Sequence, residues 1–376
     1  MSSVMKLAEV VDVVIGVDTH VQTHAAALVD ARTGGVLAEI TVEAAAEGYS
    51  ELVAFADQAA EQHGALRAWA IEGTGSHGRG LTSHLLAADE FVVELDRAER
   101  ARRRGGVKSD PADAIRAARE ALARAEMSDV CRLGAPRGAG QDREHADIRQ
   151  ALVTRSAARR SAVQAAGDAR RQLFSAVLTA PEPLRARLRG LKAAALITTA
   201  ANLSGTTKWA TIDIETTHTV ACLRTLGRRI RDLQAEAAEH EREIRKLVLA
   251  WRPDLLAEPG IGPITAAVIL CAWSHTGRLH SEAAFAKLAG TSPIEATSGQ
   301  IHARHRLNTY GDRRLNCALH TIVITRQRQH QDTRTYIDRR TTEGKTPREI
   351  RRCLKRYLAR DLYRLLEHPP TPLDTT

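Results

Sequence analysis

Four carboxylate residues in the amino-terminal third of the chain could together hold a metal ion. Asp18 and Glu72 each stand where a predicted strand ends, and Asp110 and Asp113 are three residues apart, on one face of a predicted helix. Converging carboxylates repel one another unless cations neutralise them, and Mg²⁺, with Mn²⁺ as the alternative, prefers such oxygen ligands. Two such ions can activate a nucleophile and stabilise the leaving oxygen of a phosphodiester. The four residues therefore predict a metal-dependent site that cuts nucleic acid.

Each of these acids has a plainer explanation when it is taken alone. An Asp after a strand is commonly a turn residue, and Asp110 or Asp113 beside Pro111 could simply cap a helix. The ordered set is more specific than any of its members, and for this reason we favour the metal site.

A glycine-rich segment after the fourth predicted strand offers a competing interpretation. Residues 73–78 read GTGSHG, which fits the G-x-G-x-x-G turn of dinucleotide-binding folds, and Glu94 and Asp96 follow about 20 residues later. That turn belongs after a first strand, and a dinucleotide fold would leave Asp18 unexplained. We expect instead that the glycines let a nucleic-acid backbone approach Glu72. An actin-like ATPase is also disfavoured, because no second glycine-rich phosphate segment follows.

The elements that must position these acids form an α/β domain over residues 1–130. Three strands in a meander come first, and two further strands follow, each preceded by a helix, which predicts a mixed sheet with helices on its faces. This is the element order of the RNase-H/RuvC-like fold. The predicted strands are VVIGVDTH, HAAALVD, GVLAEITVEA, RAWAIEG and FVVELD, and the predicted helices cover 44–63, 79–88 and the segment that opens at KSDPADA.

Beyond a Gly/Pro/Arg linker at 134–140 the strand signals disappear, and residues 131–250 are predicted to be helical. Helices are expected over 143–178 and 184–203, and a third carries apolar residues in a 3,4,3,4 spacing typical of a coiled coil. We favour pairing of this seam with the 143–178 helix in an antiparallel arm, with extension into a dimer contact as the alternative. The seam consists of Leu223, Leu226, Ile230, Leu233, Ala237, His240, Ile244 and Leu247.

Residues 251–376 are predicted to form a mainly helical carboxy-terminal domain. The segment EPGIGPITAAVIL resembles a helix-hairpin-helix turn, in which Gly260 and Gly262 would offer backbone N–H groups to a DNA phosphate. An ordinary Gly/Pro connection is the alternative. Further on, Ser298 stands before Gly299 and could be an exposed nucleophile on a turn, although a Ser-Gly pair is usually only a turn.

The charge of the chain points to a polyanionic partner. The net charge is +9, and arginine, which grips phosphate with two hydrogen bonds, far outnumbers lysine. A basic surface that serves only solubility is the alternative explanation. The residues that we expect to contact nucleic acid, besides the two glycines, are Arg102, Arg103, Arg104, Lys108, Arg304, Arg306, Arg313, Arg314, Arg351, Arg352 and Lys355.

Cysteine usage and hydropathy bear on the compartment. The five cysteines are scattered without a C-x-x-C pair, which suits free thiols in a reducing cytosol, and no segment reaches the roughly 20 apolar residues of a membrane span. We expect a cytoplasmic protein, associated with the nucleoid when it is bound to DNA, and no membrane partner.

With these motifs assembled, the chain resembles the DEDD-type insertion-sequence transposases, relatives of the Piv DNA invertases, some of which are guided by a bridge RNA. The segments GVDTH, AIEGTGSHG and VKSDPADA resemble the RuvC-like half of that family. EPGIGPITAAVIL, KLAGTSPIEATSG and YGDRRL resemble its transposase half. The resemblance runs over nearly the whole chain in the same order.

The resemblance implies roles for particular residues. Asp18, Glu72, Asp110 and Asp113 would be the acidic tetrad, and Ser298 the serine that attacks DNA and forms a phosphoserine link to it. A homodimer or homotetramer is expected, with DNA and a guide RNA as partners. Two alternatives stay open: a RuvC-like Holliday-junction nuclease that uses water as its nucleophile, and a non-catalytic nucleic-acid-binding protein.

Overall fold

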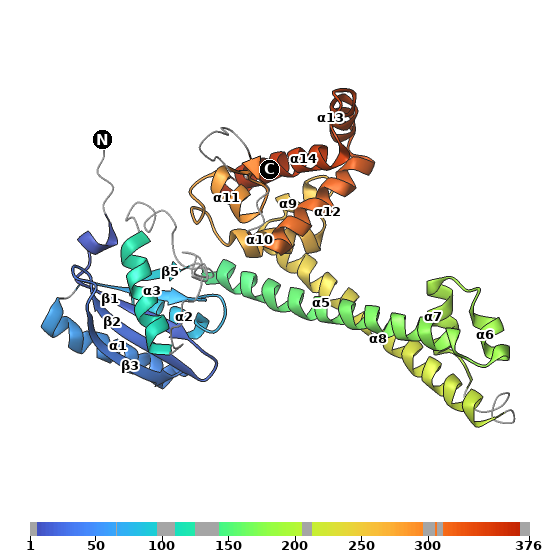
Figure 1. The fold of residues 1–376 in the computed structure, drawn as a ribbon, viewed down its shortest axis with the longest axis horizontal. Helices are drawn as coiled ribbons and strands as arrows, with labels where there is room; N and C mark the ends of the chain where they lie inside the picture. Colours follow the sequence, from blue (N-terminus) through green and yellow to red (C-terminus); the bar gives the residue numbers. More distant parts are fainter. Residues whose placement is uncertain are drawn as a thin grey trace, which may run out of the picture. The chain divides into compact units, whose positions relative to one another are not determined.

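The structure of the chain is a computed structural model that falls into two compact units (Figure 1). One unit consists of residues 1–149 and 269–376, and the other of residues 150–268. The residues whose structure is described are 6–64, 66–95, 110–124, 143–204, 213–295, 305–306 and 311–368.

A five-stranded mixed sheet forms the centre of the amino-terminal part. Its strand order is β3-β2-β1-β4-β5; β1, β2 and β3 are antiparallel neighbours, and β4 and β5 run parallel to β1. This confirms the predicted meander and mixed sheet. The strands are β1 (Val13–Thr19), β2 (Thr23–Asp30), β3 (Val36–Glu43), β4 (Arg67–Glu72) and β5 (Val92–Leu95), after a short 3-10 helix, η1 (Leu7–Glu9).

Helices cover both faces of this sheet because alternate strand residues bury opposite faces. Val13, Ile15 and Val17 belong to the core under α1 (Ala46–His63) and α2 (Arg79–Ala87). Val14 packs on the other face, in a core that includes residues of α3 (Asp110–Arg124). The sheet order and its helical layers form an RNase-H-like α/β domain, as predicted.

The arm contains two long helices, α5 (Arg143–Leu178) and α8 (Ile214–Trp251). The predicted heptad seam lies on α8. Every seventh residue of the seam on α8 is buried, namely Leu223, Ile230, Ala237 and Ile244. Half-buried residues fill the alternate seam positions.

Contacts within the unit show that α8 pairs with α5 of the same chain. Arg155 of α5 lies 3.2 Å from His240 Nδ1, and Arg159 donates to Glu241 at 2.8 Å. Toward the other end, Leu173 of α5 shares a core with Leu223 of α8. The two helices are therefore antiparallel, which confirms the predicted intramolecular pairing.

The single helix predicted over 184–203 is wrong, since two short helices occupy that stretch. They are α6 (Glu182–Leu188) and α7 (Ala193–Ala201), and they are separated by a turn at Gly190. A glycine costs a helix about 1 kcal/mol relative to alanine, and here it coincides with the break.

The carboxy-terminal part is mainly helical, as predicted, but it also holds a two-stranded antiparallel ribbon, β6 (Ile294–Glu295) with β7 (His305–Arg306), that the sequence did not indicate. Strands of two residues carry too little alternation to be seen in a sequence. No helix in the described ranges is long and apolar enough to cross a membrane. The helices are α9 (Asp254–Ala257), α10 (Pro263–Trp273), α11 (Glu282–Leu288), α12 (Arg313–Gln329), α13 (Gln331–Thr342) and α14 (Pro347–Glu367).

A charged network at the start of β4 ties that strand to its neighbours. The Arg67 guanidinium donates to both carboxylate oxygens of Glu90 and forms an ion pair with Asp57 at 2.7 Å, and the Trp69 indole donates to Glu90 at 2.7 Å. Burial alone would raise the pKa of Glu90, but the hydrogen bonds from Arg67 and Trp69 outweigh it, so the pKa lies below its usual range. The network therefore needs an ionised Glu90.

Replacing Glu90 by Gln tests this network. A carboxyl with a depressed pKa stabilises the fold above its unfolded-state pKa, and this stability is lost as the pH falls through the folded-state pKa. We expect Glu90→Gln to lower the free energy of opening of β4 and β5 by about 1–3 kcal/mol at pH 7, and by less toward pH 4. Amide hydrogen exchange of the two strands measures this. Glu39→Gln, at an exposed position of β3, is the control, and equal protection in both variants would contradict the role of Glu90.

Candidate metal centre

Close packing of α3 on β1 places the first turn of this helix beside the end of the strand. Gly16 faces α3, and a Cβ atom built there would overlap the Ala114 carbonyl oxygen and lie 2.6 Å from the Ala118 backbone nitrogen. Ala114 and Ala118 are fully buried. Only a glycine, facing alanines, lets the helix backbone lie this close to the sheet.

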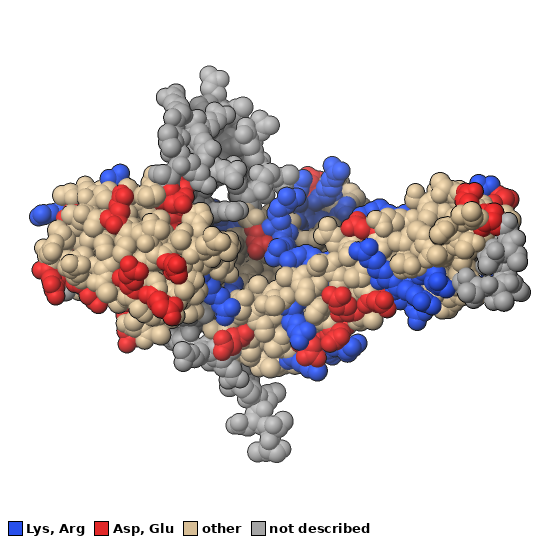
Figure 2. All heavy atoms as spheres, turned by 90° about the horizontal axis from the view of Figure 1, so that it is seen from below, with Lys and Arg blue, Asp and Glu red and all other residues tan. Residues whose placement is uncertain are grey.

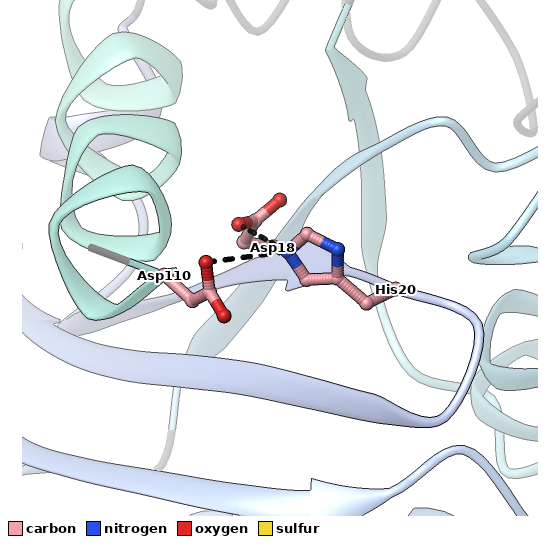
Figure 3. A group of neighbouring side chains, drawn as sticks. All are labelled: Asp18, His20 and Asp110. Carbon is pink, nitrogen blue, oxygen red and sulfur yellow. Dashed lines mark hydrogen bonds and ion pairs between the residues drawn. The ribbon is translucent and has the colours of Figure 1, made fainter. Parts of the chain in front are cut away.

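Asp18 and Asp110 converge as a result, and a ring nitrogen of His20 faces both of them (Figure 3). His20 Nε2 lies 3.1 Å from Asp18 Oδ2 and 3.5 Å from Asp110 Oδ1. One donor atom from each of the three residues lies within 4.8 Å of the others. Asp18 is mostly buried, whereas Asp110 is 56% exposed, so the cluster opens to solvent on the side of α3.

Glu72 is placed next to Asp18 by the register of the sheet. Val17 pairs with Ile71 in the parallel β1–β4 ladder, and the next residue of each strand is Asp18 and Glu72. The Thr19 hydroxyl donates to the Glu72 carbonyl oxygen at 3.0 Å, which fixes the two strand ends to each other. Side chains at paired positions of neighbouring strands share one face, so Glu72 stands on the α3 face with Asp18.

Asp113 does not join the three-residue cluster. It shares the face of α3 with Asp110, but its carboxylate accepts a hydrogen bond from Arg116 at 2.8 Å, one turn further along the helix. The four predicted acids therefore lie in one region of the domain, and two of them, Asp18 and Asp110, are in the compact group.

The residue that the sequence reasoning missed is His20. A signal was present, since His20 is two residues after Asp18 and alternate residues of an extended strand point to the same face. The prediction considered only carboxylates, and so it overlooked the His20 imidazole, which lies next to Asp18 and Asp110.

A second histidine, His24, lies next to the backbone of His20 in the β1–β2 turn. His24 is fully buried and stacks on Tyr49 with the ring centroids 5.7 Å apart, and its Nδ1 lies 3.1 Å from the Thr23 carbonyl oxygen and 3.4 Å from the backbone nitrogen of His20. Burial lowers the pKa of His24 and outweighs its backbone hydrogen bond to Thr23, which raises it, so the ring is neutral at pH 7. A neutral, immobile ring holds the backbone of His20 in place.

The donor set of this cluster fits a divalent cation. Two ligand atoms at adjacent corners of an octahedron with bonds of about 2.1 Å lie about 3.0 Å apart. The distances of 3.1 and 3.5 Å from His20 to the two carboxylates are close to this value. Small movements of the exposed Asp110 side chain would close the set around an ion.

In the glycine turn at the start of α10, one of the two glycine N–H groups forms a hydrogen bond within the turn. Gly260 has a positive φ of 78°, while the N–H of Gly262 donates to the Thr265 hydroxyl at 3.0 Å. The N–H of Gly262, which we expected to face a phosphate, is therefore engaged within the turn. Phosphate binding at this turn stays a prediction.

The described basic residues that we predicted to contact nucleic acid differ in how exposed they are and in whether they are engaged within the protein. Arg313 and Arg314 are exposed at the first turn of α12, and Arg352 is exposed on α14. The Lys355 ammonium instead donates to Asn316 at 2.9 Å, and burial lowers its pKa, so it contributes to packing between α14 and α12. Arg351 is half-buried and donates to the carbonyl of Pro347.

The remaining candidates lie wholly or partly outside the described residues. Arg306 is described only through its pairing in β7. The positions outside are Arg102, Arg103, Arg104, Lys108, Ser298 and Arg304.

The described sheet domain itself is acidic. Residues 6–64, 66–95 and 110–124 contain seven Lys and Arg against seventeen Asp and Glu. In the space-filling view of one face, Asp and Glu predominate over the sheet domain, and Lys and Arg gather over the helical parts (Figure 2). The positive net charge of the chain therefore comes from segments outside this domain.

The RNase-H-like sheet, with carboxylates where β1 and β4 end and where α3 begins, defines a class of domain that cuts nucleic acid. Family comparisons agree with this. A transposase model of the IS110 DEDD type matches residues 15–135, and a model described as the transposase IS116/IS110/IS902 family matches residues 254–338. Together the two segments cover more than half of the chain. None of the curated proteins matches it.

The chain belongs to the IS110-type family of DEDD transposases. It is a mobile-element DNA transposase, an enzyme of a family that cuts and rejoins DNA, and the family implies DNA binding and the use of divalent metal. Asp18, Glu72, Asp110 and Asp113 all fall within the matched amino-terminal segment.

Replacing Gly16 by Ala tests the packing that assembles the site. The added methyl group meets helix backbone, so α3 must move outward, and overpacking of this kind costs about 1–3 kcal/mol. We expect lower thermal stability and, because Asp110 moves with the helix, weaker Mn²⁺ binding by isothermal titration calorimetry. Gly75→Ala is the control, since a Cβ there meets nothing within 4 Å. Unchanged Mn²⁺ affinity in Gly16→Ala would show that α3 does not position the site.

Proposed function

We propose that this transposase cuts and rejoins the DNA of a mobile element through Mg²⁺ held by Asp18, Glu72, Asp110 and Asp113, with Ser298 as the nucleophile. The observation that carries the metal site is the convergence of Asp18 and Asp110 beneath the first turn of α3. Ser298 rests on the resemblance of KLAGTSPIEATSG to the transposase half of the family and on the family match over residues 254–338.

Within this proposal the acids have separate tasks. Asp18, in the centre of the sheet, and Glu72 beside it provide fixed ligands, and Asp110 and Asp113 reach the same region from α3. Divalent ions bound there lower the cost of forming an alkoxide and stabilise charge on the phosphate. Asp113 exchanges its ion pair with Arg116 for this role, and the freed guanidinium can then meet a phosphate.

In the proposed reaction each phosphate ester bond that breaks is replaced by another phosphate ester bond. The Ser298 hydroxyl loses its proton and its oxygen bonds to phosphorus, while the bond from phosphorus to one deoxyribose oxygen breaks and that oxygen takes up a proton. The resulting phosphoserine is then attacked by a hydroxyl of another DNA end, which restores a phosphodiester and frees the serine. No external energy source is needed, because each step exchanges one phosphate ester for another.

DNA reaches the acidic sheet domain with the help of basic residues elsewhere in the chain. Seventeen carboxylates against seven basic residues repel a phosphate backbone unless cations intervene. The exposed Arg313 and Arg314, together with the basic segment 102–104, supply that attraction in this proposal. Divalent ions held by Asp18, Glu72, Asp110 and Asp113 would neutralise the remaining charge at the point of cleavage.

The position of Ser298 in the chain bears on assembly. It follows Asp113 by 185 residues and belongs to the proposed carboxy-terminal domain 251–376, whereas the acids belong to the proposed domain 1–130. The helical region 131–250 stands between them. We propose that folding or a second protomer brings the serine to the acids, in a homodimer or homotetramer that also takes up a guide RNA.

Trapping of a covalent adduct separates this proposal from a nuclease that uses water. We expect the wild-type protein to form a phosphoserine link with labelled element-end DNA, seen as a shifted band on a denaturing gel. Ser298→Ala removes the link and the cutting together, because no other nucleophile replaces the serine. Asp18→Asn also abolishes both, with DNA binding retained. Continued cutting by Ser298→Ala would establish the nuclease, and full recombination by Asp18→Asn would remove the acids from the mechanism.

RNA that co-purifies with the protein tests the guided form of the proposal. We expect sequencing of this RNA to yield one predominant species, because a dedicated guide has one defined sequence. The same purification is repeated with Arg313→Ala and Arg314→Ala. We expect these variants to lower the RNA yield, because phosphate contacts are lost. Random cellular fragments alone would exclude a dedicated guide.

A further inference from the structure

We propose that His20 is a metal ligand, so that the ion next to α3 has a mixed nitrogen and oxygen donor set and the site prefers Mn²⁺ to Mg²⁺. This inference rests on the proposed metal site, to which it adds a residue outside the acidic tetrad. The close group of potential ligands consists of Asp18, His20 and Asp110, and it includes the imidazole where the tetrad would place a carboxylate.

The imidazole of His20 points at the carboxylates and not away from them. Figure 3 shows one ring nitrogen facing both Asp18, which comes from the same strand end, and Asp110, which comes from α3. Its Nε2 atom is the one nearest to both acids, at 3.1 and 3.5 Å. Atoms at adjacent corners around one octahedral ion lie about 3.0 Å apart, so a single ion can be shared by all three residues.

The backbone that carries His20 is fixed on two sides. Its N–H faces the Thr23 carbonyl oxygen at 3.2 Å across the β1–β2 turn and His24 Nδ1 at 3.4 Å. His24 is buried against Tyr49. The His20 side chain is 43% exposed, but a backbone held this way keeps the imidazole in place beside the two acids when an ion binds.

An imidazole ligand has a consequence for metal choice. Mg²⁺ strongly prefers oxygen ligands, whereas sites with nitrogen and oxygen ligands bind first-row transition-metal ions, of which Mn²⁺ is the one that, like Mg²⁺, also suits carboxylates. Removal of a supporting residue around a metal ligand already costs about 10–100-fold in affinity, and loss of a direct ligand costs at least as much. Loss of His20 should therefore weaken Mn²⁺ more than Mg²⁺.

Pulsed electron paramagnetic resonance of Mn²⁺ bound to the full-length protein tests this directly. We expect modulation from a coordinated imidazole nitrogen, which changes to the ¹⁵N pattern when the protein is grown with ¹⁵N-histidine. In His20→Ala the nitrogen signal is lost, Mn²⁺ affinity falls by about 10-fold or more, and Mg²⁺ affinity, measured by competition, falls by less. His63→Ala, at the exposed end of α1, keeps the signal and both affinities.

Asp18→Asn separates this inference from the proposed function. If the wild type binds Mn²⁺ and Asp18→Asn does not, the carboxylate site stands, and absence of the nitrogen signal then overturns the role of His20 alone. If neither protein binds Mn²⁺, both the site and the ligand are refuted. Equal loss of Mn²⁺ and Mg²⁺ in His20→Ala, with no nitrogen signal in the wild type, identifies His20 as a residue that only supports the local fold.

Discussion

The contact between α3 and β1 at Gly16 is the constraint on which the rest of the candidate site depends. A helix that starts with acidic residues can bring them to a strand end only if its backbone lies close to the sheet, and here a glycine faces the buried Ala114 and Ala118. The contact itself is apolar, but its effect is to bring two charged side chains together. It holds Asp110 near Asp18, and two carboxylates this close repel each other, which a bound cation relieves.

The opposite face of the sheet contributes rigidity and not chemistry. Large apolar side chains such as Trp69 and Leu85 fill that core, while the α3 face combines alanines, among them Ala70 and Ala118, with larger aliphatic residues. The Arg67–Glu90 pair holds β4 to the chain that precedes β5, and Thr19 joins the ends of β1 and β4. The strand ends that carry Asp18 and Glu72 are therefore anchored from both sides, which is what a metal site needs in order to keep its ligands oriented.

Charge is divided unequally along the chain, and this division suits a two-part enzyme. The sheet domain concentrates carboxylates, and the basic residues belong largely to other segments. The acidic domain alone would repel DNA. In the proposed mechanism the basic segments and the carboxylates act on the same phosphate, so that binding and cutting depend on different parts of one chain.

The sequence by itself determined the order of the strands, the long helices of the arm and the four acids, because alternation, heptad spacing and strand-end carboxylates are local patterns. It did not determine which acids meet. Only the tertiary structure decided that Asp18 and Asp110 share a group with His20 while Asp113 pairs with Arg116, because side-chain partners depend on how closely α3 packs at Gly16. The two-residue strands β6 and β7 are too short to show an alternating pattern, and the break at Gly190 is a local cost of glycine that the prediction of one helix overlooked.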